Sequence, residues 1–161
     1  TIEHALYPVH SEQKLALLRH VLDEGELASA IVFTRTKHRA RKIARQLSSS
    51  GHRAVALQGN MSQSQRERAM DGFRKRRFDV LVATDIAARG IDVQQVSHVV
   101  NYDMPNTTDA YTHRIGRTGR ADRQGKAYTF VTGEDHGLVR QVERRLGASI
   151  PRREVGGISS L

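Results

Sequence analysis

The sequence predicts one α/β domain in which helices cover both faces of an open, mostly parallel sheet. The chain has 161 residues, a length that suits a single globular domain with its own hydrophobic core. Five short apolar runs, rich in β-branched residues, alternate with segments of helical periodicity. Because such runs are typical of strands buried on both faces, and because parallel strands need crossover connections, the alternation indicates a parallel sheet with helical crossovers.

The first half of the chain begins with an extended segment, IEHALYPV, and continues into a helix. Leu15, Leu18 and Leu22 share one face of that helix, which has Ser11 as its cap and Gly25 as its stop. The elements that follow are a strand at 30–34, a basic helix at 37–50 ended by a glycine, a strand at 53–57 and a helix at 62–76. The last helix opens with a Ser-x-x-Gln sequence that matches a capping box.

The second half continues the same alternation. Its predicted elements are strands at 80–84, 98–102 and 127–131 and helices at 107–115 and 134–146. The tail from Pro151, PRREVGGISSL, is rich in Gly and Ser and has little apolar content. We therefore divide the chain into a domain at residues 1–150 and the start of a linker or flexible tail at 151–161.

The charge of the chain points to a phosphate-rich partner. It has 26 Lys and Arg residues against 17 Asp and Glu, which gives a formal net charge of +9, and 21 of the basic residues are Arg. On charge alone, a phosphate-rich ligand and a merely soluble basic surface are equally supported. The excess of Arg favours the ligand, because a planar guanidinium can hold phosphate oxygens bidentately.

Composition also excludes several kinds of site. A chain without Cys has no disulfide, no thiolate nucleophile and no Cys-based zinc site, and the eight His lack close ligand spacing with carboxylates, so we expect no metal ligands. No apolar run reaches about 18 residues and no export signal is present, so we expect no membrane contact and a cytoplasmic location. The first residue, Thr1, indicates a piece of a longer protein.

Five loops carry the candidate chemistry, because ligands of parallel α/β sheets bind at the carboxyl ends of the strands. Their sequences are TRTK, QGNMSQ, TDIAARGID, YDMP and HRIGRTGR. Neither a P-loop (GxxxxGKS or GxxxxGKT) nor a dinucleotide-binding GxGxxG after a strand occurs. If this domain works on a nucleotide, another domain must supply the main phosphate cradle.

The segment TDIAARGID leaves the end of a predicted buried strand. Thr84 and the backbone of Gly90 can meet phosphates there, and the carboxylate of Asp92 can accept hydrogen bonds from ribose hydroxyls. The alternative is a plain turn in which Asp85 caps a short helical stretch through Ala88.

Two other loops offer groups to a nucleic-acid strand. In QGNMSQSQR, Gly59 permits close approach of the backbone, and Gln63 and Arg66 lie three residues apart on one face of a helix whose N-terminus favours anions. In TRTKHRARK, Thr36 and Lys37 lie at the carboxyl end of a strand. A capped helix with solvated polar residues and the wet face of an amphipathic helix are the respective alternatives.

The segment HRIGRTGR is the hardest to explain without a ligand. Arg114, Arg117 and Arg120 recur at every third residue, and their mutual repulsion needs an anionic partner. The glycines at 116 and 119 let the chain turn tightly and come near that ligand.

Together, AIVFTRTK, QGNMSQSQR, TDIAARGIDV and HRIGRTGR, in this order and spacing, resemble the second RecA-like domain of DEAD-box RNA helicases over residues 2–151. The His-Arg opening of the last motif distinguishes this family from related DNA helicases and the DEAH group, which usually begin it with Gln. The QGN segment departs from the more frequent His-Gly-Asp but retains the glycine. The ending IPRREVGG resembles the bacterial RhlE-type subgroup.

The resemblance implies a role for each motif residue. Arg117 and Arg120 correspond to arginines that reach the γ-phosphate of ATP, Asp92 corresponds to the ribose contact, and His113 and Arg114 correspond to groups that couple this site to the partner domain. The residues that correspond to RNA-backbone contacts are Thr36, Lys37, Gly59, Gln63, Arg66, Thr84 and Gly90. Such contacts read no base sequence.

The implied function is that of the C-terminal lobe of an ATP-dependent RNA helicase, an RNA-stimulated ATPase. The N-terminal RecA-like domain, which this chain lacks, is expected to hold most of the ATP and its Mg²⁺, so the isolated chain is expected to be inactive. One alternative is a stand-alone RNA-binding or scaffold domain, against which the retention of Arg117, Arg120 and Asp92 argues. The other is a DNA helicase lobe, which His113 and Arg114 disfavour.

Overall fold

The computed structural model describes residues 1–25, 27–89, 96–119 and 124–158. Within these ranges six strands form one sheet in the order β1-β6-β5-β2-β4-β3, and every strand pairing is parallel. The strands are β1 (Ile2–Pro8), β2 (Ala30–Phe33), β3 (Ala54–Leu57), β4 (Val80–Ala83), β5 (His98–Asn101) and β6 (Gly125–Val131). The predicted fold class is therefore confirmed.

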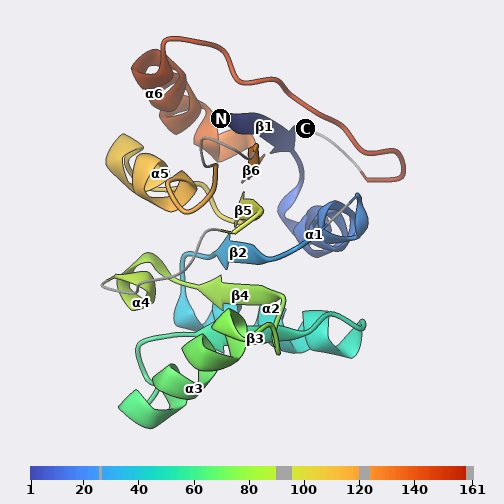
Figure 1. The fold of residues 1–161 in the computed structure, drawn as a ribbon. Coiled ribbons are helices and arrows are strands. Elements are labelled where there is room, and N and C mark those ends of the chain that lie inside the picture. The colour runs from blue at the N-terminus through green and yellow to red at the C-terminus, as the bar shows by residue number, and fades with distance from the viewer. Residues whose placement is uncertain (26, 90–95, 120–123, 159–161) are drawn as a thin grey trace.

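Helices cover both faces of the sheet (Figure 1). They are the 3₁₀ turn η1 (Ser11–Gln13), α1 (Lys14–Asp23), α2 (Lys37–Ser49), α3 (Gln63–Arg74), α4 (Asp85–Ala88), α5 (Thr108–Ile115), η2 (Gly133–Asp135) and α6 (His136–Leu146). Successive strand residues point to opposite faces, so Val32 packs with α1 and α2 while Ile31 packs with α3. On the same face as α3, α5 and α6 pack against Leu6 and Ala127 of the two strands at the other end of the sheet.

Local signals located most elements to within a few residues. The capping box of α3 is present, since the Ser62 hydroxyl accepts the Gln65 N–H at 3.1 Å and the Gln65 side chain accepts the Ser62 N–H at 3.0 Å. The extended segment at residues 2–9, however, is a full strand. It pairs with β6 at seven positions, from Ile2 beside Gly125 to Pro8 beside Val131.

The tail beyond residue 150 follows the outer edge of β1. The Leu6 N–H donates to the Pro151 carbonyl at 2.8 Å, and the Arg153 N–H donates to the Leu6 carbonyl at 2.8 Å. Farther along, Val155 and Ile158 pack against the core cluster that contains α1. The segment therefore runs from α6 past β1 toward α1 (Figure 1). The division of the chain at residue 150 stays a prediction.

Two histidines give the fold a predicted pH dependence. Burial lowers the pKa of both His4, whose Nδ1 lies 2.8 Å from the Tyr111 hydroxyl, and His98, which is 3% exposed. In the unfolded chain both regain a pKa of about 6.5 and bind protons more readily. The stability contributed by their neutral forms is therefore present above about pH 6.5 and is lost as the pH falls toward the lowered folded-state values.

We expect the free energy of unfolding, measured by urea denaturation, to fall between about pH 7.5 and pH 5.5. His98→Asn should make this pH dependence shallower, because one proton-binding difference between the folded and unfolded states disappears. His10→Asn, at an exposed position, is the matched control and should leave the slope unchanged. A wild-type stability that stays flat across this range would contradict the assignment.

Candidate functional site

A pocket of about 460 Å³ opens at the carboxyl edge of the sheet, between α4 and α5. The ring of Phe33, the last residue of β2, forms part of its wall. Its charged and ionisable lining residues are Asp85, Arg89, Asp109, His113, Arg114 and Arg117. The pocket therefore combines one apolar wall with an excess of cationic groups, in the place where parallel sheets bind ligands.

Arg114 is a buried cation whose counter-charge lies in this chain. Its side chain is 4% exposed, and two of its nitrogens each lie 2.7 Å from one of the two carboxylate oxygens of Asp85. The third nitrogen donates to the Asn101 side chain at 3.1 Å and to the Asp103 carbonyl at 3.0 Å, and the guanidinium lies 5.0 Å from the centre of the Phe33 ring. Arg114 therefore fixes one wall of the pocket, and the coupling role predicted for it stays a prediction.

His113 and Arg117 line the same pocket from α5 and from the turn that follows it. The Thr107 side chain caps α5 by accepting the Ala110 N–H at 3.0 Å. His113 is exposed and Arg117 is half-buried, while Arg120 lies outside the described residues. Of the two described arginines in the evenly spaced set, Arg114 is buried against Asp85, whereas Arg117 is half-buried, and both line the pocket.

Gly119 serves the packing of the domain, and the ligand approach that the sequence suggested for it stays a prediction. Its φ is +80°, and a Cβ built on it would lie 2.5 Å from Ile2 Cγ1 and 3.0 Å from the Thr1 carbonyl oxygen. Gly116 has an ordinary helical φ of −61°. The second glycine therefore lets the chain after α5 lie directly against the start of β1.

Gly119→Ala should lower the free energy of unfolding by about 2 to 5 kcal/mol, the sum of a left-handed backbone penalty and overpacking against backbone. Gly59→Ala is the matched control, because its added Cβ meets nothing within 4 Å. Urea denaturation of both variants would check this. A Gly119→Ala protein as stable as Gly59→Ala would show that the loop does not press on β1.

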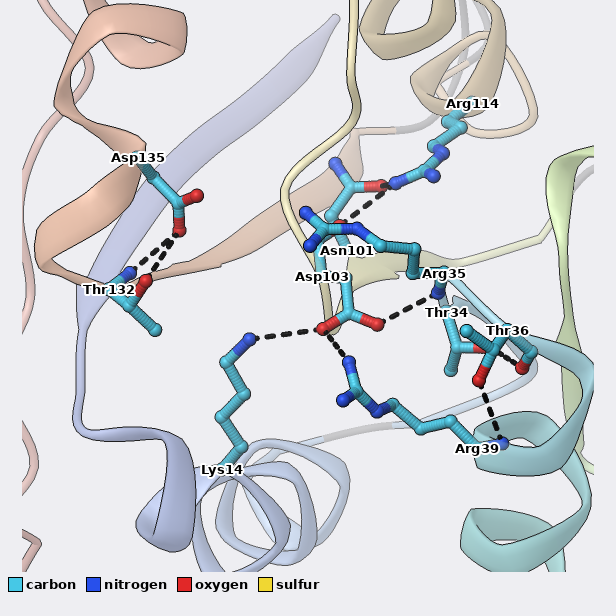
Figure 2. Close-up of polar contacts among 10 residues, drawn as sticks. All are labelled: Lys14, Thr34, Arg35, Thr36, Arg39, Asn101, Asp103, Arg114, Thr132 and Asp135. Atoms are coloured by element: carbon cyan, nitrogen blue, oxygen red, sulfur yellow. Dashed lines mark hydrogen bonds and ion pairs between the residues drawn. The ribbon is translucent and has the colours of Figure 1, made fainter.

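Asp103 is a second buried charge at this edge, just after β5. Its carboxylate, 3% exposed, accepts from Lys14 Nζ at 3.2 Å, from an Arg39 guanidinium nitrogen at 2.6 Å and from the Arg35 N–H at 2.8 Å. Figure 2 shows Lys14 and Arg39 approaching it from different helices. Burial opposes its ionisation, but the hydrogen bonds from Arg39 and Arg35 and the charge of Lys14 prevail and hold its pKa below the ordinary value.

Asp103 connects the two halves of the candidate site. Its side chain anchors the loop that carries the predicted RNA contacts Thr36 and Lys37, while its carbonyl accepts from Arg114 on the pocket side. The Thr36 side chain in turn caps α2 by accepting the Arg39 N–H at 3.2 Å. The sequence identified the YDMP loop as a candidate. It could not predict that Asp103 lies between the two parts of the site, because that position depends on the order of the strands in the sheet.

The described residues predicted to contact RNA lie along the carboxyl ends of β2, β3 and β4. Lys37 Nζ donates to the Asn60 side chain at 3.2 Å, which joins the loops after β2 and β3. Arg66 donates to the Arg89 carbonyl at 3.2 Å, which joins α3 to the segment after β4. The structure therefore brings these dispersed residues to one edge of the sheet.

Gly59 is exposed, and an added Cβ there meets nothing within 4 Å, so the space beside its backbone is open. Gln63 is also exposed, and its amide donates to Glu67 at 3.2 Å. The turn after β4 is capped by Thr84, whose hydroxyl accepts the Ala87 N–H at 3.3 Å. Asp85, the cap considered from the sequence, instead pairs with Arg114, and Gly90 and Asp92 lie outside the described residues.

Several pocket residues were not identified from the sequence. Asp109 and Arg89 enter the lining only because α4 and α5 face each other, and no local pattern reports that. The part of the chain that the structure describes holds no group of three or more His, Asp or Glu side chains placed to bind a metal ion. Within the same part, no helix combines the length and apolar character needed to span a membrane.

Comparison with known proteins places this architecture among helicases. The helicase conserved C-terminal domain family matches residues 13–122. The ATP-dependent RNA helicase DeaD of Buchnera aphidicola is 41% identical over 149 residues, which are 92% of this chain and 25% of DeaD. The ATP-dependent RNA helicase SrmB of Escherichia coli is 44% identical over 144 residues, which are 89% of this chain and 32% of SrmB.

Solved structures agree with the sequence comparison. The DEAD-box protein SrmB of Escherichia coli, bound to regulator of ribonuclease activity A, has a TM-score of 0.89 at 42% identity and covers 96% of this chain and 92% of that one. The C-terminal domain of the DEAD-box protein Dbp5 has a TM-score of 0.88 at 33% identity, with 95% and 90% covered. This chain thus spans a quarter to a third of the full length of DeaD and SrmB, but nearly all of the matched domain structures.

Proposed function

This chain belongs to the DEAD-box RNA helicase family as its helicase C-terminal domain, and from that premise we propose that it is the C-terminal RecA-like lobe of an ATP-dependent RNA helicase. The observation that carries the proposal is the cationic pocket at the carboxyl edge, lined by Arg89, His113 and Arg117 beside the residues predicted to grip RNA. A nucleotide site and an RNA site on one edge suit a lobe that links the two ligands.

We assign the pocket residues to one side of a nucleoside triphosphate. Arg117 offers positive charge, and with Arg120 it is assigned to the γ-phosphate, while Asp92 is assigned to the ribose. ATP supplies the phosphoryl group, whose transfer spreads negative charge over its outer oxygens and therefore depends on positioned cations. Because the chain has no P-loop, the proposed N-terminal lobe holds the remaining phosphates and the Mg²⁺.

The residues along the carboxyl ends of β2, β3 and β4 are assigned to the RNA backbone. Thr36, Lys37 and Gln63 present hydroxyl, ammonium and amide groups, all of which bind phosphate oxygens without reading bases. Arg66 joins this group to the pocket through its hydrogen bond to Arg89. Gly59, Thr84 and Gly90 complete the set with backbone and hydroxyl donors.

Coupling follows if both ligands favour the same arrangement of the two lobes. Closure would bring Arg117 and Arg120 to the nucleotide of the N-terminal lobe and would complete the RNA path across both lobes. Two ligands that prefer one state must strengthen each other's binding by the same factor. His113 is assigned to contact the N-terminal lobe directly, and Arg114 acts indirectly by orienting Asp85.

The test compares the isolated chain with the full-length protein. The isolated chain should show no RNA-stimulated ATP hydrolysis, and the full-length protein should show it. The parent gene should encode a P-loop and an Asp-Glu-Ala-Asp segment upstream of Thr1; their absence would refute the proposal and favour a stand-alone RNA-binding domain.

A cytoplasmic location is proposed as well, and cell fractionation is its test.

A further inference from the structure

Helix α2 carries a basic surface to which the proposed function gives no role. The residues of α2 that pack into the core are Ala40, Ile43, Ala44 and Leu47. On the opposite side, His38, Lys42 and Arg45 are exposed and follow one another at helical spacing. We call these three residues the α2 basic face.

Within the part of the chain that the structure describes, no carboxylate pairs with Lys42 or Arg45 of this face. No Asp or Glu occurs anywhere between residues 27 and 66, whereas eight Lys and Arg do. Arg39, on the flank of α2, pairs with Asp103. Among the described residues, Lys42 and Arg45 take part in no ion pair. Their like charges, three residues apart, repel each other and weaken the isolated helix. An anionic ligand bound between them would relieve this repulsion.

The α2 basic face begins where the proposed RNA site ends. Thr36 caps α2 and Lys37 is its first residue, and both belong to the predicted RNA contacts. Arg45 lies eight residues farther along, about 12 Å at a rise of about 1.5 Å per residue. Lys37, Lys42 and Arg45 therefore place three cations along roughly two helical turns from the start of α2.

We propose that the α2 basic face is a second binding surface for the nucleic-acid backbone, which extends the RNA path beyond the sheet edge. The inference rests on the proposed function for its starting point at Lys37. Lys42 and Arg45 contact phosphates without reading bases. The extension lengthens the footprint on RNA, so only strands longer than the edge site use it.

The test uses the purified chain and its double variant Lys42→Gln/Arg45→Gln, since Gln keeps helix propensity and removes charge. Fluorescence anisotropy measures binding to labelled oligouridines of about 20 and about 5 nucleotides at several salt concentrations. For the long strand, affinity should fall about tenfold and the log-log salt slope should become shallower by about 1.4, the value for two phosphates. The short strand should bind as it does to the wild type.

Arg140→Gln/Arg144→Gln is the matched control, because these exposed arginines of α6 carry the same charge at the far end of the molecule from α2 (Figure 1). Equal losses in the control would assign the effect to net charge and overturn the proposal, as would unchanged binding of the long strand or an equal loss for both strands. Binding of oligoglutamate is measured in the same way. If the Lys42→Gln/Arg45→Gln variant loses affinity for oligoglutamate but not for the oligouridines, the proposal is overturned in favour of an acidic protein partner.

Arg66→Gln separates this inference from the proposed function. If the edge site binds RNA, this variant weakens both oligouridines. If Arg66→Gln leaves both unchanged while the α2 variant weakens the long one, the edge site fails and the α2 basic face stands as an independent RNA surface.

Discussion

Replacing Arg117 with alanine in the full-length protein should lower the turnover number for ATP about 10³-fold or more, while ATP affinity changes far less. That loss corresponds to roughly 4 kcal/mol of transition-state stabilisation. The reason is that a positioned guanidinium acts mainly on the charge that develops during phosphoryl transfer, and less on the ground state. Steady-state kinetics with saturating RNA, together with nucleotide titration, measure the two quantities separately.

Two further variants sharpen this prediction. Arg117→Lys keeps the charge but loses the planar fork, so it should recover only part of the lost turnover. Arg140→Ala, at an exposed position on α6, should leave turnover unchanged. Equal losses in turnover and affinity would show that Arg117 only binds nucleotide, and unchanged turnover would remove it from the catalytic groups. Arg120→Ala is expected to follow Arg117→Ala.

The elements of the fold that the sequence predicted are those with signals inside one segment. The capping box at Ser62 and Gln65 and the fully apolar runs of β2 and β4 are read within a few residues. The strand β1 was missed as a strand because IEHALYP contains Glu3 and His4 and ends in a proline. Its pairing with β6 involves residues more than 120 positions away, and no local pattern reports such a contact.

The sequence predicted the motifs of the candidate site and the edge of the sheet where they lie. It did not predict which side chains pair with one another there. The even spacing of Arg114 and Arg117 suggested that both face one anion, yet Arg114 pairs with Asp85, 29 residues earlier. β4 and β5 both flank β2, which brings the residues after them together, and spacing along the chain cannot encode that order. The same reason explains why Asp103 was noted within YDMP without a role.

Asp103→Asn should lower the free energy of unfolding by about 3 to 5 kcal/mol, the range for removing one partner of a buried ion pair. The side chains of Lys14 and Asp103 are 8% and 3% exposed, so the variant leaves the Lys14 ammonium buried with no opposite charge. The new amide also places an N–H₂ group among the donors of Arg39 and Arg35. Urea denaturation at neutral pH measures the loss.

The pH dependence of this loss follows from the direction of the pKa shift. Because the pKa of Asp103 is lowered in the folded state, its stabilisation is present above the unfolded value of about 3.9 and is lost as the pH falls through the folded value. The difference in stability between the wild type and Asp103→Asn should therefore narrow in acid. A difference that persists unchanged would indicate that shape, and not charge, is what the carboxylate supplies.

The double variant Lys14→Met/Asp103→Leu separates the buried charge from the other contacts of Asp103. If the stranded ammonium causes the loss, removing both charges should recover most of it, to within about 1 to 2 kcal/mol of the wild type. Lys14→Met alone should cost less than Asp103→Asn, because Asp103 keeps its contacts with Arg39 and with the Arg35 N–H. A double variant as unstable as Asp103→Asn would instead assign the loss to the donors left without a partner, the Arg35 N–H and the Arg39 guanidinium.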